Sequence, residues 1–299
     1  MQKLQPHDRQ HKTALKPSLT PLPIVLLHGL LSTPREFGMI ALPLRARGVK
    51  LITPQIEGYT DADRRKPGGW KDWAAAAASA IDRELGKAQP FVLGGLCSGG
   101  LIAAALTMRR EFKVRALVMM SPTFDYDGWG QTGWRHWRRL GYALGLDRLI
   151  SVAERSPYGI KNPRIRQWVE RDMQQRASSA AGPSSLPLWA IHEVDRLKAH
   201  VLEHLPRLHT RTLVMHARED EVCSLAAVQR AFSTLPDHDN SLVVLENSYH
   251  MITIDNDRQQ VVAELLKCAG NTSQASAAMT PTRDAQASQQ LPLAVARTA

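Results

Sequence analysis

The sequence predicts an α/β protein with a mostly parallel sheet of about six core strands, helices on both faces of the sheet and a helical cap insertion. Short apolar runs alternate along the chain with longer amphipathic or alanine-rich stretches. Strands buried on both faces have near-continuous apolar sequences, and strands that alternate with helices are typical of a parallel sheet. One connection is also far longer than an ordinary loop, which indicates the insertion.

Six apolar runs are expected to form the core strands. Each run is short and is bounded by polar residues, glycine or proline, as buried strands usually are. The runs cover residues 23–29, 49–55, 90–96, 114–122, 211–217 and 241–248.

Helices are expected in the stretches between these runs. Residues 33–48 begin with a Thr-Pro pair, which favours a helix start, and end at a glycine, which favours a helix stop. Residues 69–87 are rich in alanine, the strongest helix former. Further helices are expected to begin near Ser98, Ser224 and Asp255.

The long connection divides the chain into regions. About 88 residues separate the strand that ends at Pro122 from the strand that starts at Arg211, and they hold five of the seven tryptophans. We interpret this stretch as a cap packed over one end of the sheet. The expected regions are a flexible N-terminal arm at 1–20, an α/β core at 21–124 and 211–270, a helical cap at 125–210 and a disordered tail at 271–299.

Composition excludes several classes of protein. The chain has 299 residues, 43% apolar and 22% charged, as in ordinary globular proteins. Its net charge of +10 is spread over several regions, and no nucleic-acid-binding motif accompanies it. The chain contains no run of about 18 apolar residues, which is the length needed to span a membrane. We therefore expect no nucleic-acid partner and no membrane span.

The cysteines and the N-terminal residues bear on location. The chain has three cysteines, Cys97, Cys223 and Cys268, with no short spacing between them. This pattern indicates neither a disulfide framework nor a zinc site, and it is typical of a reducing compartment. The first residues are polar and show no apolar stretch of signal-peptide length. The expected location is the cytoplasm, with no metal and no cofactor.

The stretch VLGGLCSGG at 92–100 is the strongest chemical signal in the chain. An apolar strand runs into a bend flanked by glycines, where a helix is expected to start. The central residue of such a turn has a strained backbone with positive φ, and the residues two positions away must be small. Gly95 and Gly99 frame Cys97 in this way, whereas Leu96 would crowd Ser98. Cys97 is therefore the predicted nucleophile, and the Ser98 N–H is a predicted oxyanion donor.

Two further candidate residues follow later strands. Asp220 comes after the run 211–217, and His250 comes after the run 241–248. The carboxyl ends of parallel strands meet at one edge of the sheet, which is the same edge as Cys97. The order nucleophile, acid, histidine would let the His250 imidazole accept the Cys97 proton while Asp220 holds the opposite ring nitrogen.

Five motifs in this order resemble the α/β-hydrolases, in particular the carboxylesterase and monoacylglycerol-lipase branch with a short helical cap. The resemblance extends from about Pro23 to Cys268. The motifs are HGLLSTPREF at 28–37, GGWKDWAAAA at 68–77, GGLCSGG at 94–100, LVMHAREDEV at 213–222 and NSYHMITIDNDRQQV at 247–261.

The resemblance implies further roles, and the chain departs from the family at the central turn. It selects Asp220 over the neighbouring Glu219 as the acid, and it implies the Leu30 N–H as the second oxyanion donor. His28 is expected to shape that loop. The family has serine in Gly-Leu-Ser-x-Gly-Gly at the central turn, where this chain has Cys97.

These residues predict an acyl hydrolase of the carboxylesterase or thioesterase type. The helix N-terminus and the imidazole both favour a thiolate, which would attack an ester or thioester of an apolar acyl group and form an acyl-thioester. Because an acyl-thioester is a good acyl donor, the same triad also suits an acyltransferase or a polyester synthase or depolymerase. A non-catalytic ligand-binding protein of the same fold is the third alternative.

Substrate contacts are less sharply indicated. Trp129, Trp134 and Trp137 in the expected cap are candidates for lining an acyl pocket. The arginines at 135–139 could meet the phosphates of coenzyme A or of an acyl carrier protein, although an exposed helix face would give the same pattern. Acyl length, leaving group, acceptor and oligomeric state are left open by the sequence.

Overall fold

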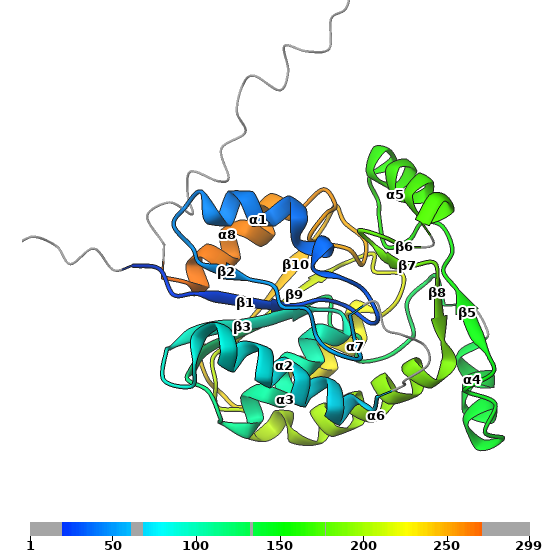
Figure 1. Cartoon of the computed structure of the whole chain (residues 1–299), viewed down its shortest axis with the longest axis horizontal. Coiled ribbons are helices and arrows are strands. Elements are labelled where there is room, and N and C mark those ends of the chain that lie inside the picture. Colours follow the sequence, from blue (N-terminus) through cyan, green and yellow to red (C-terminus); the bar gives the residue numbers. More distant parts are fainter. Residues whose placement is uncertain (1–19, 61–67, 132–133, 177, 271–299) are drawn as a thin grey trace, which may run out of the picture.

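The computed structural model describes residues 20–60, 68–131, 134–176 and 178–270 (Figure 1). The expected arm at 1–20, apart from residue 20, and the expected tail at 271–299 lie outside the described residues. No helix in the described ranges is both long enough and apolar enough to cross a bilayer.

A six-stranded sheet forms the centre of the molecule, with every neighbouring pair parallel. The strand order is β10-β9-β4-β3-β1-β2. This confirms the expected α/β class and the mostly parallel sheet. The strands are β1 (Ile24–Leu27), β2 (Leu51–Ile52), β3 (Phe91–Leu96), β4 (Val114–Met120), β9 (Thr212–Ala217) and β10 (Ser241–Leu245).

Two layers of helices cover the two faces of the sheet (Figure 1). On one face, α1 (Gly38–Arg45) packs against α8 (Arg258–Cys268). On the other face, α3 (Ser98–Arg109) contacts both α2 (Trp70–Leu85) and α6 (Leu188–His204). Each layer closes its own cluster of buried apolar side chains against the strands. A short helix, α7 (Leu225–Phe232), follows β9.

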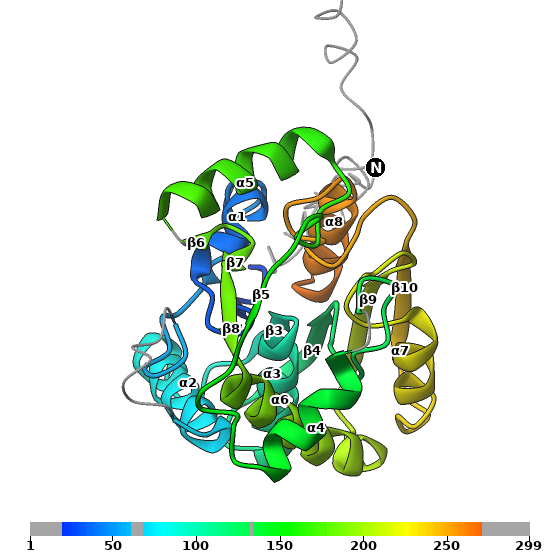
Figure 2. The same ribbon diagram turned by 90° about the vertical axis from the view of Figure 1, so that its right-hand side faces the viewer.

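The connection between β4 and β9 lies largely beyond the carboxyl ends of the strands (Figures 1 and 2). It contains α4 (Trp134–Ala143) and α5 (Pro163–Arg176), but also strands that were not expected. These form two antiparallel ladders, β5 (Ser151–Ala153) with β8 (Ser185–Pro187) and β6 (Ser178–Ser179) with β7 (Gly182–Pro183).

Helix α6 belongs by its contacts to the layer of α2 and α3 rather than to the outlying part of this connection. The expected cap range of 125–210 therefore includes a helix that packs in the core, because the apolar side of α6 is buried against α3. The role of the outlying part as a cap stays a prediction.

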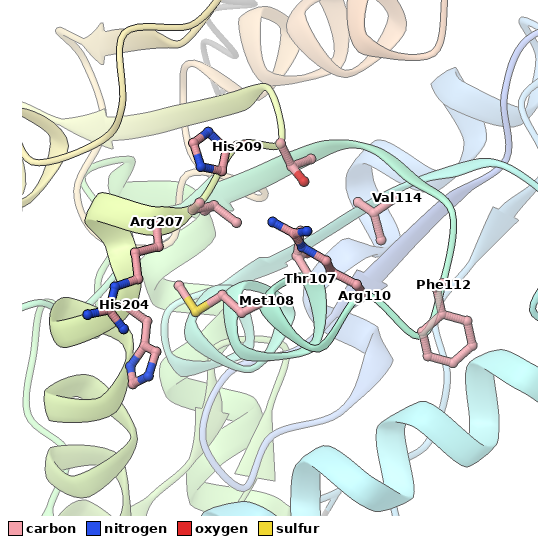
Figure 3. Close-up of a pocket in the computed structure, with 10 residues that line it drawn as sticks. Thr107, Met108, Arg110, Phe112, Val114, His204, Arg207 and His209 are labelled. Atoms are coloured by element: carbon pink, nitrogen blue, oxygen red, sulfur yellow. The ribbon is translucent and has the colours of Figure 1, made fainter.

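A cavity of about 470 Å³ lies at the opposite, amino edge of the sheet, near the starts of β4 and β9 (Figure 3). Phe112 and Leu208 contribute apolar surface, and Arg110 and Arg207 contribute cations. Parallel strands place this edge a full strand length from the turn after β3. The cavity is therefore separate from the site that contains Cys97.

Candidate active site

Cys97 occupies the turn between β3 and α3 with φ 55° and ψ −126°, in the strained region that the glycine frame predicted. The two glycines are sterically required. A Cβ at Gly95 would lie 2.3 Å from the carbonyl carbon of Gly99, and a Cβ at Gly99 would lie 2.2 Å from the Leu27 oxygen. No side chain fits at such distances, so the strand and the helix pack backbone to backbone and hold Cys97 at the tip of the turn.

Ser98 is fully buried as the first residue of α3. Its hydroxyl lies 2.7 Å from the Tyr59 hydroxyl, which donates to the His28 carbonyl at 3.1 Å. The Ser98 side chain therefore has a structural partner in the interior. Cys97, in contrast, is a free and partly exposed thiol. Of the two neighbours, only Cys97 is not fully buried.

His250 and Asp220 meet at the carboxyl edge of the sheet. The His250 Nδ1 lies 2.8 Å from the Asp220 Oδ2. The other oxygen of Asp220 accepts the backbone N–H groups of Val222 and Cys223 at 2.8 and 3.0 Å. These bonds fix the carboxylate, which in turn fixes the histidine ring with its Nε2 free to face a third group.

The electrostatics of this pair favour a charged histidine. Burial alone lowers the pKa of His250, but the charges of Asp220 and Cys97 and hydrogen bonds with both side chains outweigh it, and the pKa lies well above its usual value. Burial likewise raises the pKa of Asp220, but His250 and His216 overcome this and hold it below its usual value. In the structure, His250 therefore lies between Asp220, which it contacts through Nδ1, and Cys97, whose charge and hydrogen bond also raise its pKa.

Thr123 contacts the Cys97 sulfur and was not predicted from the sequence. Its Oγ1 lies 3.1 Å from the Cys97 Sγ, and the side chain is almost fully buried. It lies three residues after the end of β4, and Cys97 directly follows the neighbouring strand β3, so the pairing of these strands brings the two residues close. Only the general rule that strand ends gather at one edge could have pointed to it, and that rule does not select one threonine.

The loop after β1 carries the predicted oxyanion donor Leu30. Gly29 donates its N–H to the Glu36 Oε2 at 2.7 Å, and Leu31 has a positive φ of 50°. His28 is fully buried, with ring nitrogens 2.9 Å from the Gly29 oxygen and 2.6 Å from the Thr60 hydroxyl. Burial lowers the pKa of His28 to about 4, so it is a neutral residue that shapes this loop.

Two buried glutamates surround His250 and were not singled out by the sequence. Burial raises the pKa of Glu36 to about 7, against the hydrogen bond from Gly29. Burial and the charge of Asp220 raise the pKa of Glu221 to about 7. Glu221 accepts the backbone N–H of His250 at 3.2 Å. The candidate site is thus rich in carboxyl groups whose charge changes near neutral pH.

The three predicted substrate-contacting tryptophans differ in placement. Trp129 donates from Nε1 to the Glu219 carbonyl at 2.9 Å and packs edge-on against Tyr249. It therefore packs against the loops that carry Asp220 and His250. Trp137 lies on α4 with 71% of its surface exposed. The side chain of Trp134 lies outside the described residues.

Other polar candidates have structural partners. Arg138, from the expected phosphate-contacting cluster, is buried and binds Asp195 at 3.0 Å. Cys223 and Cys268 are buried, and burial raises their pKa values to about 12 and about 11. No group of three potential metal ligands occurs among the described residues.

Comparison with known proteins gives one family over most of the chain. The model of the serine aminopeptidase S33 family matches residues 22–257. The chain belongs to the serine aminopeptidase S33 family. A thermostable monoacylglycerol lipase from Bacillus sp. (strain H-257) is 21% identical to this S33-family protein over 253 residues, which are 83% of this chain and 90% of the relative.

Solved structures share the fold of this S33-family protein. A monoacylglycerol lipase from Paleococcus ferrophilus superposes with a TM-score of 0.66 at 18% identity, covering 83% of this chain and 96% of the other. A thioesterase domain from the curacin biosynthetic pathway superposes with a TM-score of 0.58 at 18% identity, covering 82% and 91%. The expected α/β-hydrolase fold is confirmed, as is the expectation of a hydrolytic enzyme.

Proposed function

We propose that this S33-family protein is an acyl hydrolase that cleaves a carboxylic ester or thioester of an apolar acyl group through Cys97, His250 and Asp220. The observation that carries the proposal is the geometry of the turn at Cys97. A thiol stands at a strained tip where both flanking glycines are sterically required, with a histidine–aspartate pair beside it. The relatives named as monoacylglycerol lipases and as a thioesterase domain support acyl-ester and acyl-thioester chemistry.

The reaction would start from a thiolate–imidazolium pair. The raised pKa of His250 favours its protonated form, and a thiolate is the nucleophilic state of cysteine. The Cys97 Sγ attacks the substrate carbonyl, and the oxyanion accepts the backbone N–H groups of Leu30 and Ser98. His250 then protonates the leaving oxygen or sulfur, which departs as the acyl-thioester forms.

Deacylation would use the same residues, with His250 now accepting a proton instead of donating one. Neutral His250 takes a proton from water, whose oxygen attacks the acyl-thioester carbonyl while the Leu30 and Ser98 N–H groups again hold the oxyanion. The C–S bond breaks, the carboxylic acid leaves, and the thiolate–imidazolium pair is restored. Asp220 keeps Nδ1 protonated through both steps, so Nε2 remains the nitrogen that exchanges protons.

We propose that the segment from α4 to β8 covers this site as a cap. Its hydrogen bonds support the placement. Gly159 accepts the Met251 N–H at 2.8 Å, and the Asp255 carboxylate accepts the N–H groups of Lys161 and Asn162 at 2.7 and 2.9 Å. These bonds attach the segment to the loop of His250. Trp129, attached to the loop of Asp220, is the tryptophan best placed to meet the acyl group.

Two further elements of the proposal concern location and acceptor. The low cysteine count and the free thiols favour the cytoplasm. Cysteine at the turn also permits transfer of the acyl group to an alcohol or amine, because a thioester is a good donor. Coenzyme A or carrier-protein substrates would need cationic side chains to bind their phosphates. Arg138 of the candidate cluster already binds Asp195.

The proposal is tested by following both product release and the mass of the intact chain. The protein is incubated with 4-nitrophenyl and coenzyme A acyl esters of several lengths, with and without an added alcohol or amine. We expect hydrolysis with a transient acyl adduct that Cys97→Ala abolishes and Ser98→Ala retains. Cys97→Ser tests whether oxygen can replace sulfur.

The remaining outcomes separate the alternatives. Product that carries the added alcohol or amine would identify a transferase with the same nucleophile. Tight binding without adduct or turnover would identify a ligand-binding protein. An adduct that persists in Cys97→Ala and disappears in Ser98→Ala would refute the assignment of the nucleophile.

A further inference from the structure

The cavity at the amino edge of the sheet is lined by two segments that are far apart in the sequence (Figure 3). One is the end of α3 with the residues that lead into β4, and the other is the end of α6 with the residues that lead into β9. The volume of about 470 Å³ is in the range of sites that hold a small molecule. Helix α3 has 12 residues and is therefore about 18 Å long. Because it begins beside Cys97 and ends at the cavity, a small molecule in the cavity lies well away from the Cys97 sulfur.

One part of the lining is apolar. Phe112 and Leu208 are buried, with 8% and 3% of their surfaces exposed. The Phe112 ring also packs edge-on against Phe91, with 6.1 Å between the ring centres, which holds it in place. Met108 and Val114 are half-buried and line the same cavity. A ligand with an apolar body would remove this surface from water.

The charged part of the lining is cationic. Arg110 and Arg207 line the cavity together with the imidazoles of His204 and His209, and none of the described residues that line it is an aspartate or glutamate. Neither arginine has an ion-pair partner within the described part of the chain. In Figure 3 the Arg110 guanidinium lies in the middle of the lining residues. A guanidinium presents a planar fork of N–H donors that fits the oxygens of a carboxylate or phosphate.

The two helices that end at the cavity reduce this positive charge but do not cancel it. The carbonyl groups at the carboxyl ends of α3 and α6 each correspond to about half a negative charge. The two guanidinium groups carry two full positive charges between them, so the cavity stays positive even when both imidazoles are neutral. An anionic ligand is therefore favoured over a neutral or cationic one.

The backbone at Arg110 gives an independent reason to assign a role to its side chain. Arg110 ends α3 in the left-handed conformation, with φ 57° and ψ 23°. Glycine adopts a positive φ after a helix without steric cost, as Gly48 after α1 and Gly270 after α8 do with φ of 79° and 84°. Position 110 instead carries a long cationic side chain at a local cost. Residues held in this region are often found where a ligand binds.

We propose that this cavity binds a small organic anion, with the carboxylate or phosphate of the ligand on the Arg110 guanidinium and its apolar body on Phe112 and Leu208. An inorganic anion alone would leave the apolar wall in water, and a neutral molecule would leave Arg110 without a partner. Arg207 adds to the positive charge of the site. The inference does not rest on the proposed function, because Cys97, His250 and Asp220 do not line the cavity.

Binding to the full chain is measured by isothermal titration calorimetry with four probes. The first two, 2-naphthoate and 2-naphthyl phosphate, share an apolar body and distinguish a carboxylate from a phosphate as the anionic group. The third, 2-naphthol, has the body without the charge, and inorganic phosphate has the charge without the body. Alkylation of Cys97 by iodoacetamide, followed by the mass of the intact chain, reports whether a probe occupies the other site instead.

The variants separate Arg110 from the general positive charge of the chain. Arg110→Gln removes the cation, and Arg110→Gly removes the side chain at a φ that suits glycine. Arg109→Gln is the matched control, because Arg109 is the preceding residue, is exposed and does not line the cavity. Urea unfolding verifies that each variant is folded.

We expect at least one naphthyl anion to bind about tenfold more tightly than 2-naphthol and inorganic phosphate. Arg110→Gln and Arg110→Gly should both raise the Kd of that anion about tenfold or more, since a hydrogen bond to a charged group is lost. Arg109→Gln should change the Kd less than about twofold, because surface charges are screened by salt. The rate of Cys97 alkylation should be the same with and without the probe.

Four results would overturn the assignment. One is the absence of saturable binding of either naphthyl anion up to about 10 mM. Another is an equal loss of affinity in the Arg109 and Arg110 variants, which would mean a diffuse response to charge. A probe that slows Cys97 alkylation and binds the Arg110 variants as tightly as the original chain would lie in the other site. Inorganic phosphate that binds as tightly as both naphthyl anions would leave the apolar wall without a role.

Discussion

The Cys97 sulfur lies 3.1 Å from the hydroxyl oxygen of Thr123, across the carboxyl ends of two neighbouring parallel strands. Thr123 is almost fully buried, so its hydroxyl has little access to water. When Cys97 is a thiolate, the sulfur can only accept, and the Thr123 hydroxyl is then its donor. A hydrogen bond to a charged group inside a protein stabilises that charge more than one between neutral groups.

Thr123→Val should therefore make Cys97 less reactive. The change replaces the hydroxyl by a methyl group of similar size and leaves the turn at Cys97 intact. We expect alkylation of Cys97 by iodoacetamide to slow about tenfold, since a hydrogen bond to a charged group contributes about 1.5 kcal/mol or more. The rate of modification is followed by the mass of the intact chain.

Thr123→Ser is the matched control, because it keeps the hydroxyl and should react at the original rate. A merely structural role for Thr123 would lower stability without changing the rate of alkylation. Equal rates for the valine variant and the original chain would contradict the proposed donation.

Ser98→Ala tests the structural role of the neighbouring hydroxyl. The Ser98 Oγ lies 2.7 Å from the Tyr59 hydroxyl, which keeps the His28 carbonyl as an acceptor when the serine is removed. The expected cost is about 1 kcal/mol in the free energy of unfolding, measured with urea. The rate of adduct formation at Cys97 should change little. A large loss of that rate with unchanged stability would mean that the Ser98 side chain takes part in the reaction.

The turn at Cys97 could be predicted from the sequence because its constraint is local. Gly95 and Gly99 are dictated by atoms only a few residues away or on the adjacent strand, and any chain that makes this turn needs small residues there. Asp220 and His250 could be placed at the same edge because each follows an apolar run. A parallel sheet brings the two residues to the edge that holds Cys97, because the carboxyl ends of its strands lie on one side.

The contacts that the sequence did not predict depend on the folded chain. Thr123 gains its contact from Cys97, which follows a neighbouring strand, and Glu36 gains its role from burial beside Gly29, which the sequence pattern does not reveal. The ladder of β5 and β8 has three residues in each strand, too few for an alternating pattern to show. Arg138 and Tyr142 on α4 bind Asp195, some 50 residues further along the chain, and the sequence pattern of the helix does not reveal this contact.

Gly99→Ala should prevent stable folding, because the added Cβ would lie 2.2 Å from the Leu27 oxygen, which is backbone and cannot move aside. We expect a loss of more than about 4 kcal/mol, or no folded protein at all. Gly38→Ala is the control, since nothing lies within 4 Å of its added Cβ and its φ of −53° is helical. The control should unfold at the same urea concentration as the original chain, or at a slightly higher one. Equal stability of the two variants would contradict the close packing at the turn.

Asp220→Asn should lower kcat about 10⁴-fold if His250 acts as proposed. The asparagine carbonyl can still accept the N–H groups of Val222 and Cys223, so the loop should keep its shape. Its amide would then point at the His250 Nδ1 and favour the ring tautomer whose Nε2 carries the proton. The loss of the Asp220 charge also removes the main influence that raises the pKa of His250. Steady-state kinetics with a 4-nitrophenyl ester measures the effect, and a loss below tenfold would refute the role of Asp220.

Glu36→Gln should change how stability depends on pH. Burial raises the pKa of Glu36 from 4.5 to about 7, so between these values the folded chain holds a proton that the unfolded chain has released. The stability that this group contributes is present below pH 4.5 and is lost as pH rises to 7, at about 1.4 kcal/mol for each pH unit and about 3 kcal/mol in total. The glutamine has no proton to lose and can still accept the Gly29 N–H.

The free energy of unfolding of Glu36→Gln, relative to the original chain, should therefore rise from pH 5 to pH 8 and level off above about pH 7. Urea unfolding at several pH values measures it. Glu57→Gln is the control, because it makes the same substitution at an exposed carboxyl outside this loop. Parallel curves of unfolding free energy against pH for the variant and the original chain would mean that Glu36 is ionised at neutral pH. Because Glu36 lies in the loop of Leu30, that loop would then hold a negative charge beside the proposed oxyanion donor.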